Sequence, residues 1–168
     1  HRGPDPLLVY RCQSDGDYSL QIFNFNLSGG VDHVYRLTVT NGPFLDYAFP
    51  SGLQFGKKSN VTLYGWNLAD GDTALYTTTA SGSLHDVQLP GCANPFQLPV
   101  AIFPATLESE PNDSIETANK IVAPQVIHGR FNKPGDTDAY IFEAKKGDRL
   151  LLDVKSASLD FPADPVLK

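Results

Sequence analysis

Methionine is absent from the 168 residues, and tryptophan occurs once. Because translation starts at methionine and this chain starts at His1, we expect it to be an internal or processed piece of a longer protein. No apolar run approaches the roughly 20 residues that a membrane-spanning helix needs. Apolar residues also follow no helical period over any long window. The sequence therefore argues against membrane insertion and against a mainly helical fold.

Positive charge is scarce as well. Thirteen Lys and Arg residues stand against nineteen Asp and Glu residues, which gives a formal net charge of −6. Binding to a phosphate backbone requires a basic stripe, whereas the basic residues here are scattered along the chain. We therefore expect no nucleic-acid partner.

The motifs of common catalytic and zinc sites are missing too. The four histidines are scattered, and none forms a His-x-x-x-His or His/Cys pair of the kind that binds zinc. The chain has no Gly-x-Ser-x-Gly motif, and nothing singles out two carboxylates as a glycosidase pair. We expect no enzymatic activity and no catalytic residues. The two cysteines, Cys12 and Cys92, could form a disulfide in a secreted chain or remain free buried thiols.

Turn formers and strand formers are abundant. Thirteen prolines and fourteen glycines, with many Thr, Tyr, Phe and Val residues, predict an all-β fold of short strands. Val61 and Leu63 should share one face of a strand whose other face carries Tyr64 and Trp66. Residues 95–104, which are rich in proline, are typical of an edge strand or an inter-domain linker. Other strands are expected at residues 7–11, 18–24, 33–39, 74–77, 84–89, 126–131, 138–144 and 149–155.

Oxygen-bearing side chains are concentrated in one region. Four of them lie within six positions, and two more stand at the entrance of the strand expected at 138–144. Ca²⁺ prefers about six to eight such oxygens, so a loop that folds back onto this strand could form a Ca²⁺ site. The alternative is turn chemistry, in which Asn112 or Asp113 caps a helical turn at 114–120 and the acids are solvated. The candidate metal ligands are Glu108, Glu110, Asn112, Asp113, Asp136 and Asp138.

Residues 108–168 also carry a resemblance. Four blocks, at 110–118, 127–130, 134–143 and 146–150, are similar in order and spacing to the bacterial pre-peptidase C-terminal (PPC) domain. The resemblance implies the front half of a secreted, jelly-roll-like β-sandwich, which in some members of the family holds Ca²⁺ at this linker. The Glu-x-Glu-x-Asn-Asp segment and Asp138 match the calcium-binding members, whereas Asp136 is offset from a ligand position seen there.

Two further segments resemble known modules. Residues 1–42 resemble the back half of the same PPC domain, through Gly16-Asp-Tyr18 and Tyr35-Arg-Leu37. Residues 43–107 resemble the immunoglobulin-like IPT/TIG module, through Phe49-Pro-Ser-Gly52 and Gly65-Trp-Asn-Leu68. A half-sandwich exposes unpaired strand edges. We therefore expect the two PPC-like halves to pair as one permuted domain or to pair with another polypeptide.

Together these features predict a non-catalytic, extracellular or cell-surface module of a large secreted bacterial protein. It would act as a spacer or adhesion module with a Ca²⁺-rigidified linker, and its partners would be neighbouring modules of the same polypeptide. One alternative is a binding module for collagen-like protein or polysaccharide, which would need exposed aromatic side chains such as Trp66 and Tyr64. Another is an accessory region of a secreted peptidase.

Overall fold

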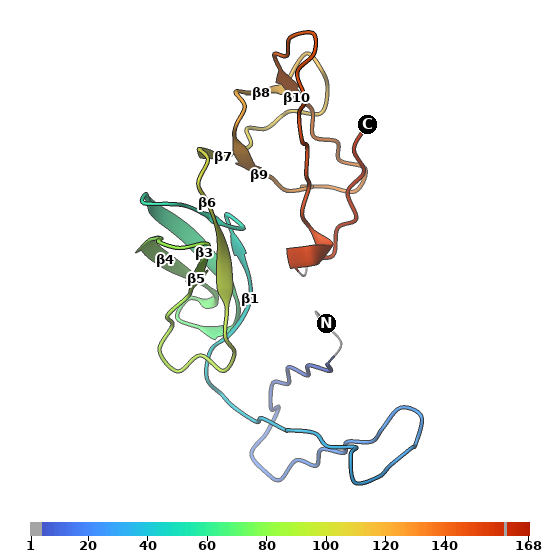
Figure 1. Cartoon of the computed structure of the whole chain (residues 1–168). Helices are drawn as coiled ribbons and strands as arrows, with labels where there is room; N and C mark the ends of the chain where they lie inside the picture. The colour runs from blue at the N-terminus through green and yellow to red at the C-terminus, as the bar shows by residue number, and fades with distance from the viewer. Residues whose placement is uncertain (1–4, 160) are drawn as a thin grey trace. The chain divides into compact units, whose positions relative to one another are not determined.

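The computed structural model of the chain describes residues 5–159 and 161–168. The chain divides into two compact units, one that ends at Asn41 and one that spans Gly42–Lys168. The described residues form ten strands and one short 3-10 helix, so the expected all-β fold is confirmed (Figure 1). No helix in this part of the chain is long and apolar enough to cross a membrane.

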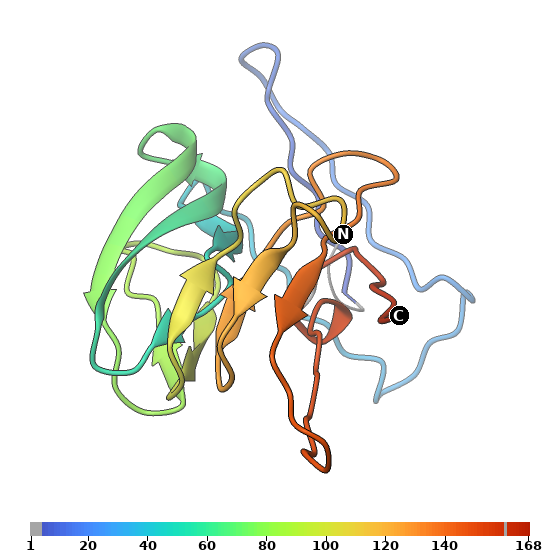
Figure 2. The same ribbon diagram turned by 90° about the horizontal axis from the view of Figure 1, so that it is seen from above.

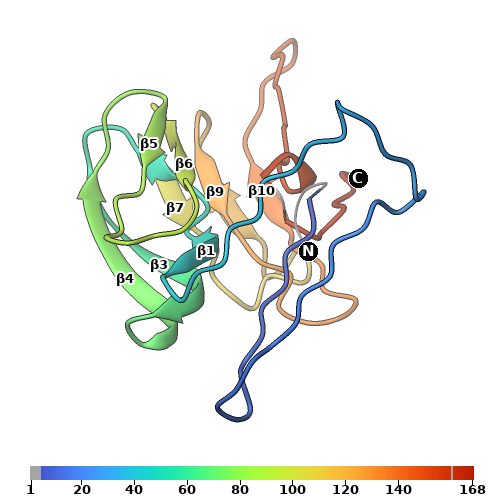
Figure 3. The same cartoon turned by 90° about the horizontal axis from the view of Figure 1, so that it is seen from below.

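Two three-stranded sheets form a sandwich in the first part of the second unit. One sheet has the order β1-β3-β4, from β1 (Phe44–Phe49), β3 (Lys58–Leu68) and β4 (Gly71–Thr79), and both pairs are antiparallel. The other has the order β2-β6-β5, from β2 (Leu53–Gln54), β5 (Leu84–Asp86) and β6 (Gln97–Ala101). Figure 2 shows β3 and β4 as long, curved neighbours, and Figure 3 shows β5 and β6 on the other side of the sandwich.

The core of the sandwich follows the alternation of apolar side chains. Val61 and Leu63 are fully buried, as expected, because alternate residues of β3 face the second sheet. On β1 the register shifts between Leu45 and Tyr47. This bulge turns both Leu45 and Ala48 toward the core although they are three residues apart. The buried core residues are Leu45, Ala48, Leu53, Val61, Leu63, Leu68, Ala74, Ala80, Val87 and Leu98.

Strand β6 corrects the interpretation of residues 95–104. Instead of an edge strand or a linker, this segment supplies the central strand of the second sheet, antiparallel to β5 and parallel to β2. Pro99 pairs with Leu84 of β5. It is accommodated because the amide of the next residue, Val100, donates to the carbonyl of Ser83 (2.9 Å) and the ladder with β2 begins only at Val100. A strand that is paired on both edges tolerates proline only where no ladder hydrogen bond is needed.

The rest of the second unit contains two small parallel sheets. β7 (Ala105–Leu107) pairs with β9 (Val126–His128), and β8 (Asn119–Ile121) pairs with β10 (Tyr140–Phe142). The strands expected at 126–131 and 138–144 are therefore present in shorter form. Residues 149–155 form no strand and lead into a 3-10 helix at Ala157–Leu159. The expected helical turn at 114–120 is a short turn that β8 follows.

The first unit differs from expectation. No strand forms within residues 5–41, so the strands predicted at 7–11, 18–24 and 33–39 are wrong. Local contacts organise this unit instead, such as the hydrogen bond that the Tyr18 hydroxyl donates to the carbonyl of Ser14 (2.7 Å). The first unit therefore supplies, among its described residues, no strand that could pair with residues 108–168. Cys12 and Cys92 are free thiols, but Cys12 is exposed and Cys92 is half-buried, so the expectation of buried thiols is wrong.

Candidate metal site

Two segments of the second unit meet to form the acidic region. The loop after β7 carries Glu108 to Asp113, and the segment before β10 carries Asp136 and Asp138. A hydrogen bond from the amide of Ala139 to the carbonyl of Asn112 (2.8 Å) fastens the loop to the start of β10. The expectation that this loop folds back onto the strand is therefore confirmed.

Three of the six candidate ligands converge. Carboxylate oxygens of Glu110, Asp136 and Asp138 all lie within 4.8 Å of one another. The Asp136 side chain is only 2% exposed, whereas Glu110 is exposed at the edge of the group. We call these three residues the acid cluster. Carboxylates at such separations repel each other unless a proton or a cation lies between them.

Among the described residues, two side chains in and beside the acid cluster have buried polar atoms without a hydrogen-bond partner. Asn112 is fully buried, yet neither atom of its side-chain amide makes a hydrogen bond. The backbone of Asn112, in contrast, is bonded on both sides. Its backbone amide donates to Glu110 Oε2 (3.0 Å) and its backbone carbonyl accepts from the amide of Ala139, so Asn112 lies between the two segments. Asp138 Oδ1 is likewise buried without a partner. A buried polar group without a partner costs about 1–3 kcal/mol, so these atoms need an explanation.

The electrostatics of Asp138 match this geometry. Burial raises its pKa to about 6, and the negative charge of Glu108 adds the next largest effect, ahead of Asp136 and Glu110. Each of these carboxylates disfavours ionisation of Asp138. A bound cation would reverse the effect by favouring the ionised form, so the site's own chemistry fits a metal ion.

Lys133 holds part of the region in place. Its ammonium group lies 3.0 Å from Asp113 Oδ1 and 3.6 Å from Asp136 Oδ1. The hydrogen bond and the charge of Asp113 raise the pKa of Lys133, while a backbone hydrogen bond from Asn132 lowers the pKa of Asp136. Asp113 is exposed and lies outside the acid cluster, so the structure places it against Lys133 instead.

Glu108 also lies outside the acid cluster. Its Oε1 accepts a hydrogen bond from the backbone amide of Arg130, and its Oε2 accepts one from the Tyr140 hydroxyl (3.2 Å). A Cβ atom at Gly129 would collide with Oε2 of Glu108, so glycine permits this close approach. Burial and the charge of Glu108 raise the pKa of Tyr140, which therefore stays a neutral donor.

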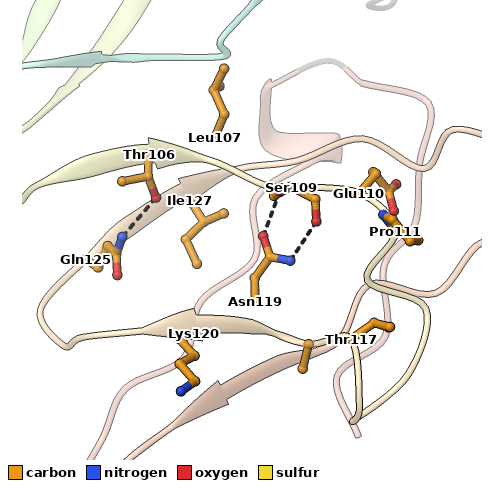
Figure 4. A pocket seen from close by; sticks show the side chains of 11 residues that line it. Thr106, Leu107, Ser109, Glu110, Pro111, Thr117, Asn119, Lys120, Gln125 and Ile127 are labelled. Carbon is orange, nitrogen blue, oxygen red and sulfur yellow. Dashed lines mark hydrogen bonds between the residues drawn. The ribbon is translucent and has the colours of Figure 1, made fainter.

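A groove of about 590 Å³ runs beside β7 and β8, and of the acid cluster only Glu110 reaches it (Figure 4). Its polar groups are bonded to each other. The Asn119 side chain accepts from the amide of Ser109 (2.6 Å) and donates to its carbonyl (2.7 Å), and Gln125 donates to Thr106 (2.8 Å). The groove therefore offers few free polar groups to a ligand.

Sequence reasoning missed the residues that hold the acids in place. Lys133 binds Asp113, Asn132 donates to Glu110 Oε1 (2.7 Å), and Arg130 and Tyr140 hold Glu108. Lys133, Arg130 and Tyr140 are not usual calcium ligands, and Asn132 has no acidic neighbour in the sequence that would single it out. Only their spatial proximity reveals their role.

No family model matches the chain, and neither a curated protein nor a solved structure matches it significantly.

Proposed function

We propose that this chain is a non-catalytic, extracellular or cell-surface module that acts as a spacer or adhesion segment and binds Ca²⁺ at the acid cluster. The observation that carries the proposal is the buried, unpartnered side chain of Asn112 beside three converging carboxylates. The resemblance of residues 108–168 and 1–42 to the PPC domain, and of 43–107 to the IPT/TIG module, supports a secreted bacterial origin.

The donor set favours calcium over softer metals. Glu110, Asp136 and Asp138 supply carboxylate oxygens, and Asn112 supplies an amide oxygen. Ca²⁺ takes oxygen ligands in flexible geometry and accepts both carboxylates and amide carbonyls. Zinc sites are built mainly from Cys and His, neither of which belongs to the acid cluster. Water would complete the coordination, because four side chains fall short of the usual number.

Calcium at this position would bind both the loop after β7 and the segment before β10. Without a cation, the carboxylates repel each other, and Lys133 offsets part of their charge at Asp113 and Asp136. With one, the repulsion becomes attraction, and the loop is fixed to the strand. Any ligand that binds the native state alone stabilises it in proportion to RT ln(1 + [L]/Kd). A rigid junction suits a spacer.

The aromatic side chains of the outer sheet face favour a spacer over a sugar-binding module. Tyr47 and Tyr64 stack on each other with ring centroids 4.4 Å apart and planes inclined by 4°. The Arg130 guanidinium covers the ring of Phe49. A ring that already stacks within the protein offers less free face to a sugar. Trp66 is the most open of this group, at 41% exposed.

Calcium titration of the whole chain tests the proposal. We expect a binding heat in calorimetry and a rise in melting temperature at millimolar Ca²⁺. Asp138→Asn should abolish most of both signals, because it removes a buried carboxylate of the acid cluster. Asp153→Asn is the matched control, since Asp153 is exposed and pairs with Lys155 (3.6 Å). Absence of heat and of a melting shift in the unsubstituted protein would remove the proposal.

A further inference from the structure

Arg130 makes contacts in two directions. Its guanidinium carbon lies 3.8 Å from the ring centroid of Phe49 and 5.4 Å from that of Tyr64, and its Nη2 donates to the Tyr64 hydroxyl (3.2 Å). Its backbone amide, in contrast, donates to Glu108 Oε1. One residue therefore contacts both the sandwich and a carboxylate beside the acid cluster.

The aromatic contact falls on the outer face of the β1-β3-β4 sheet. Phe49 follows the buried Ala48 and Tyr64 follows the buried Leu63, so both rings point away from the core. They lie on neighbouring strands, because Phe49 pairs with Thr62 in the β1–β3 ladder. Arginine suits this position because its planar guanidinium stacks on rings while its N–H groups still donate.

The carboxylate contact lies beside the acid cluster. Glu108 stands two residues before Glu110, and its Oε2 accepts a hydrogen bond from the hydroxyl of Tyr140, two residues after Asp138. The carboxylates of the acid cluster repel that of Glu108, which the backbone amide of Arg130 and the hydroxyl of Tyr140 hold in place. A cation that neutralises the cluster removes this repulsion and leaves Glu108 fixed against the backbone at Arg130.

We propose that Arg130 is the coupling residue that transmits cation binding at the acid cluster to the outer face of the β1-β3-β4 sheet, through Glu108 on one side and the rings of Phe49 and Tyr64 on the other. This inference rests on the Ca²⁺ function proposed above. It adds a stated route by which the metal fixes the orientation of the sandwich relative to the strands β7 to β10.

Two other contacts connect the sandwich to strands β7 and β9, and they serve as a comparison for the contacts of Arg130. Ser51 Oγ bonds to His128 Nδ1 (3.1 Å), and Gln54 Oε1 accepts from the amide of Ala105 (3.2 Å). Neither involves a carboxylate, so neither is expected to respond to a cation. Removal of the Arg130 side chain should therefore leave the sandwich in contact with β7 and β9, while the response of the β1-β3-β4 sheet to calcium is lost.

The test uses Ca²⁺ itself as the probe and the whole chain with Arg130→Ala, Arg130→Lys and Arg149→Ala. Coupling between sites is reciprocal, so removing the side chain of Arg130 should weaken calcium binding and raise the calcium Kd by about fivefold or more. Ring resonances of Phe49 and Tyr64 should shift on calcium addition in the unsubstituted protein and not in Arg130→Ala. Amide resonances of residues 136–139 should still shift in both.

The two further variants separate coupling from general damage. Arg130→Lys keeps the charge and the backbone amide but loses the planar stack, so we expect an intermediate Kd and a reduced ring shift. If Arg130→Ala does not fold, Arg130→Lys takes its place as the test variant. Arg149 is exposed, and Arg149→Ala should behave as the unsubstituted chain.

The outcomes distinguish this inference from the function on which it rests. If the unsubstituted chain binds calcium and Arg130→Ala binds it equally well with the same ring shifts, the coupling is wrong and the metal site stands. If Arg130→Ala does not fold and Arg130→Lys binds with an unchanged Kd and full ring shifts, the coupling is also wrong. If the unsubstituted chain binds no calcium, both are wrong.

Discussion

At the scale of single residues, neighbouring acids in the sequence have different roles in the structure. Glu110 joins the acid cluster, Asp113 pairs with Lys133, and Glu108 accepts hydrogen bonds from Arg130 and Tyr140. The type and spacing of these residues predicted a set of six candidate ligands, of which the structure brings three together. They could not assign the roles, because each role depends on donors that lie 20 or more residues away in the chain.

His128 leads to a prediction about pH. It is buried at the end of β9, and burial lowers its pKa because the charged form loses its hydration. The folded state therefore binds this proton less readily than the unfolded state, whose histidine titrates near pH 6.5. The contribution of His128 to stability is complete above that pH and is lost as the pH falls through it. We expect a titration midpoint below about 6.5 in NMR.

The variant His128→Gln isolates this effect. Between about pH 7.5 and about pH 5.5, the unsubstituted chain should lose more melting temperature than His128→Gln does. Asp138 acts in the opposite direction, because its raised pKa favours the folded state as the pH falls toward 4. Both proteins contain Asp138, so its effect cancels in the difference. A His128 midpoint at or above 6.5, or equal losses in both proteins, would contradict the assignment.

At the scale of elements, the bulge between β1 and β3 depends on one glycine. Gly65 pairs with Leu45 where the register shifts, and a Cβ atom there would collide with the carbonyl oxygen of Phe44. We expect Gly65→Ala to lower the free energy of unfolding by about 1–3 kcal/mol, as overpacking does. Urea denaturation measures the change. Gly29→Ala is the control, because no atom lies within 4 Å of a Cβ atom there; equal stabilities would contradict the close approach.

The elements also show where alternation of apolar residues predicts a strand and where it does not. Val61 and Leu63 alternate with polar residues in β3, which has β1 and β4 beside it. Residues 18–24 and 33–39 alternate in the same way but form no strand. A strand exists only when a partner supplies hydrogen bonds and a covered face, and neither can be read from one segment. β6 is the converse, since Pro99 and the prolines on either side of the strand concealed a central strand.

At the scale of the whole molecule, apolar surface is left uncovered in both units. In the first unit Leu8, Phe23, Phe25 and Val31 are exposed, and Phe25 is 97% exposed. In the second, Leu150, Leu151, Leu152 and Val154 are exposed where a strand was expected. Contiguous exposed apolar surface is uncommon on monomeric proteins and promotes association. In the described part of the chain, the residues expected as strands in these segments pair with no other strand, and an unpaired strand edge favours pairing between chains.

This exposure predicts association that depends on concentration. The weight-average mass in sedimentation should rise between about 5 µM and about 200 µM protein, because each buried CH₂ group contributes about 0.8 kcal/mol to association. Replacing Phe23, Phe25 and Val31 by serine should lower the mass at the upper concentration, since these side chains are exposed within and on either side of the Asn24–Leu27 turn. Replacing Ser28 and Asp32 by alanine leaves that surface in place and serves as the control. A constant monomer mass over the whole range would show that the exposed segments do not self-associate at these concentrations. Their cover would then have to come from a polypeptide other than a second copy of this chain.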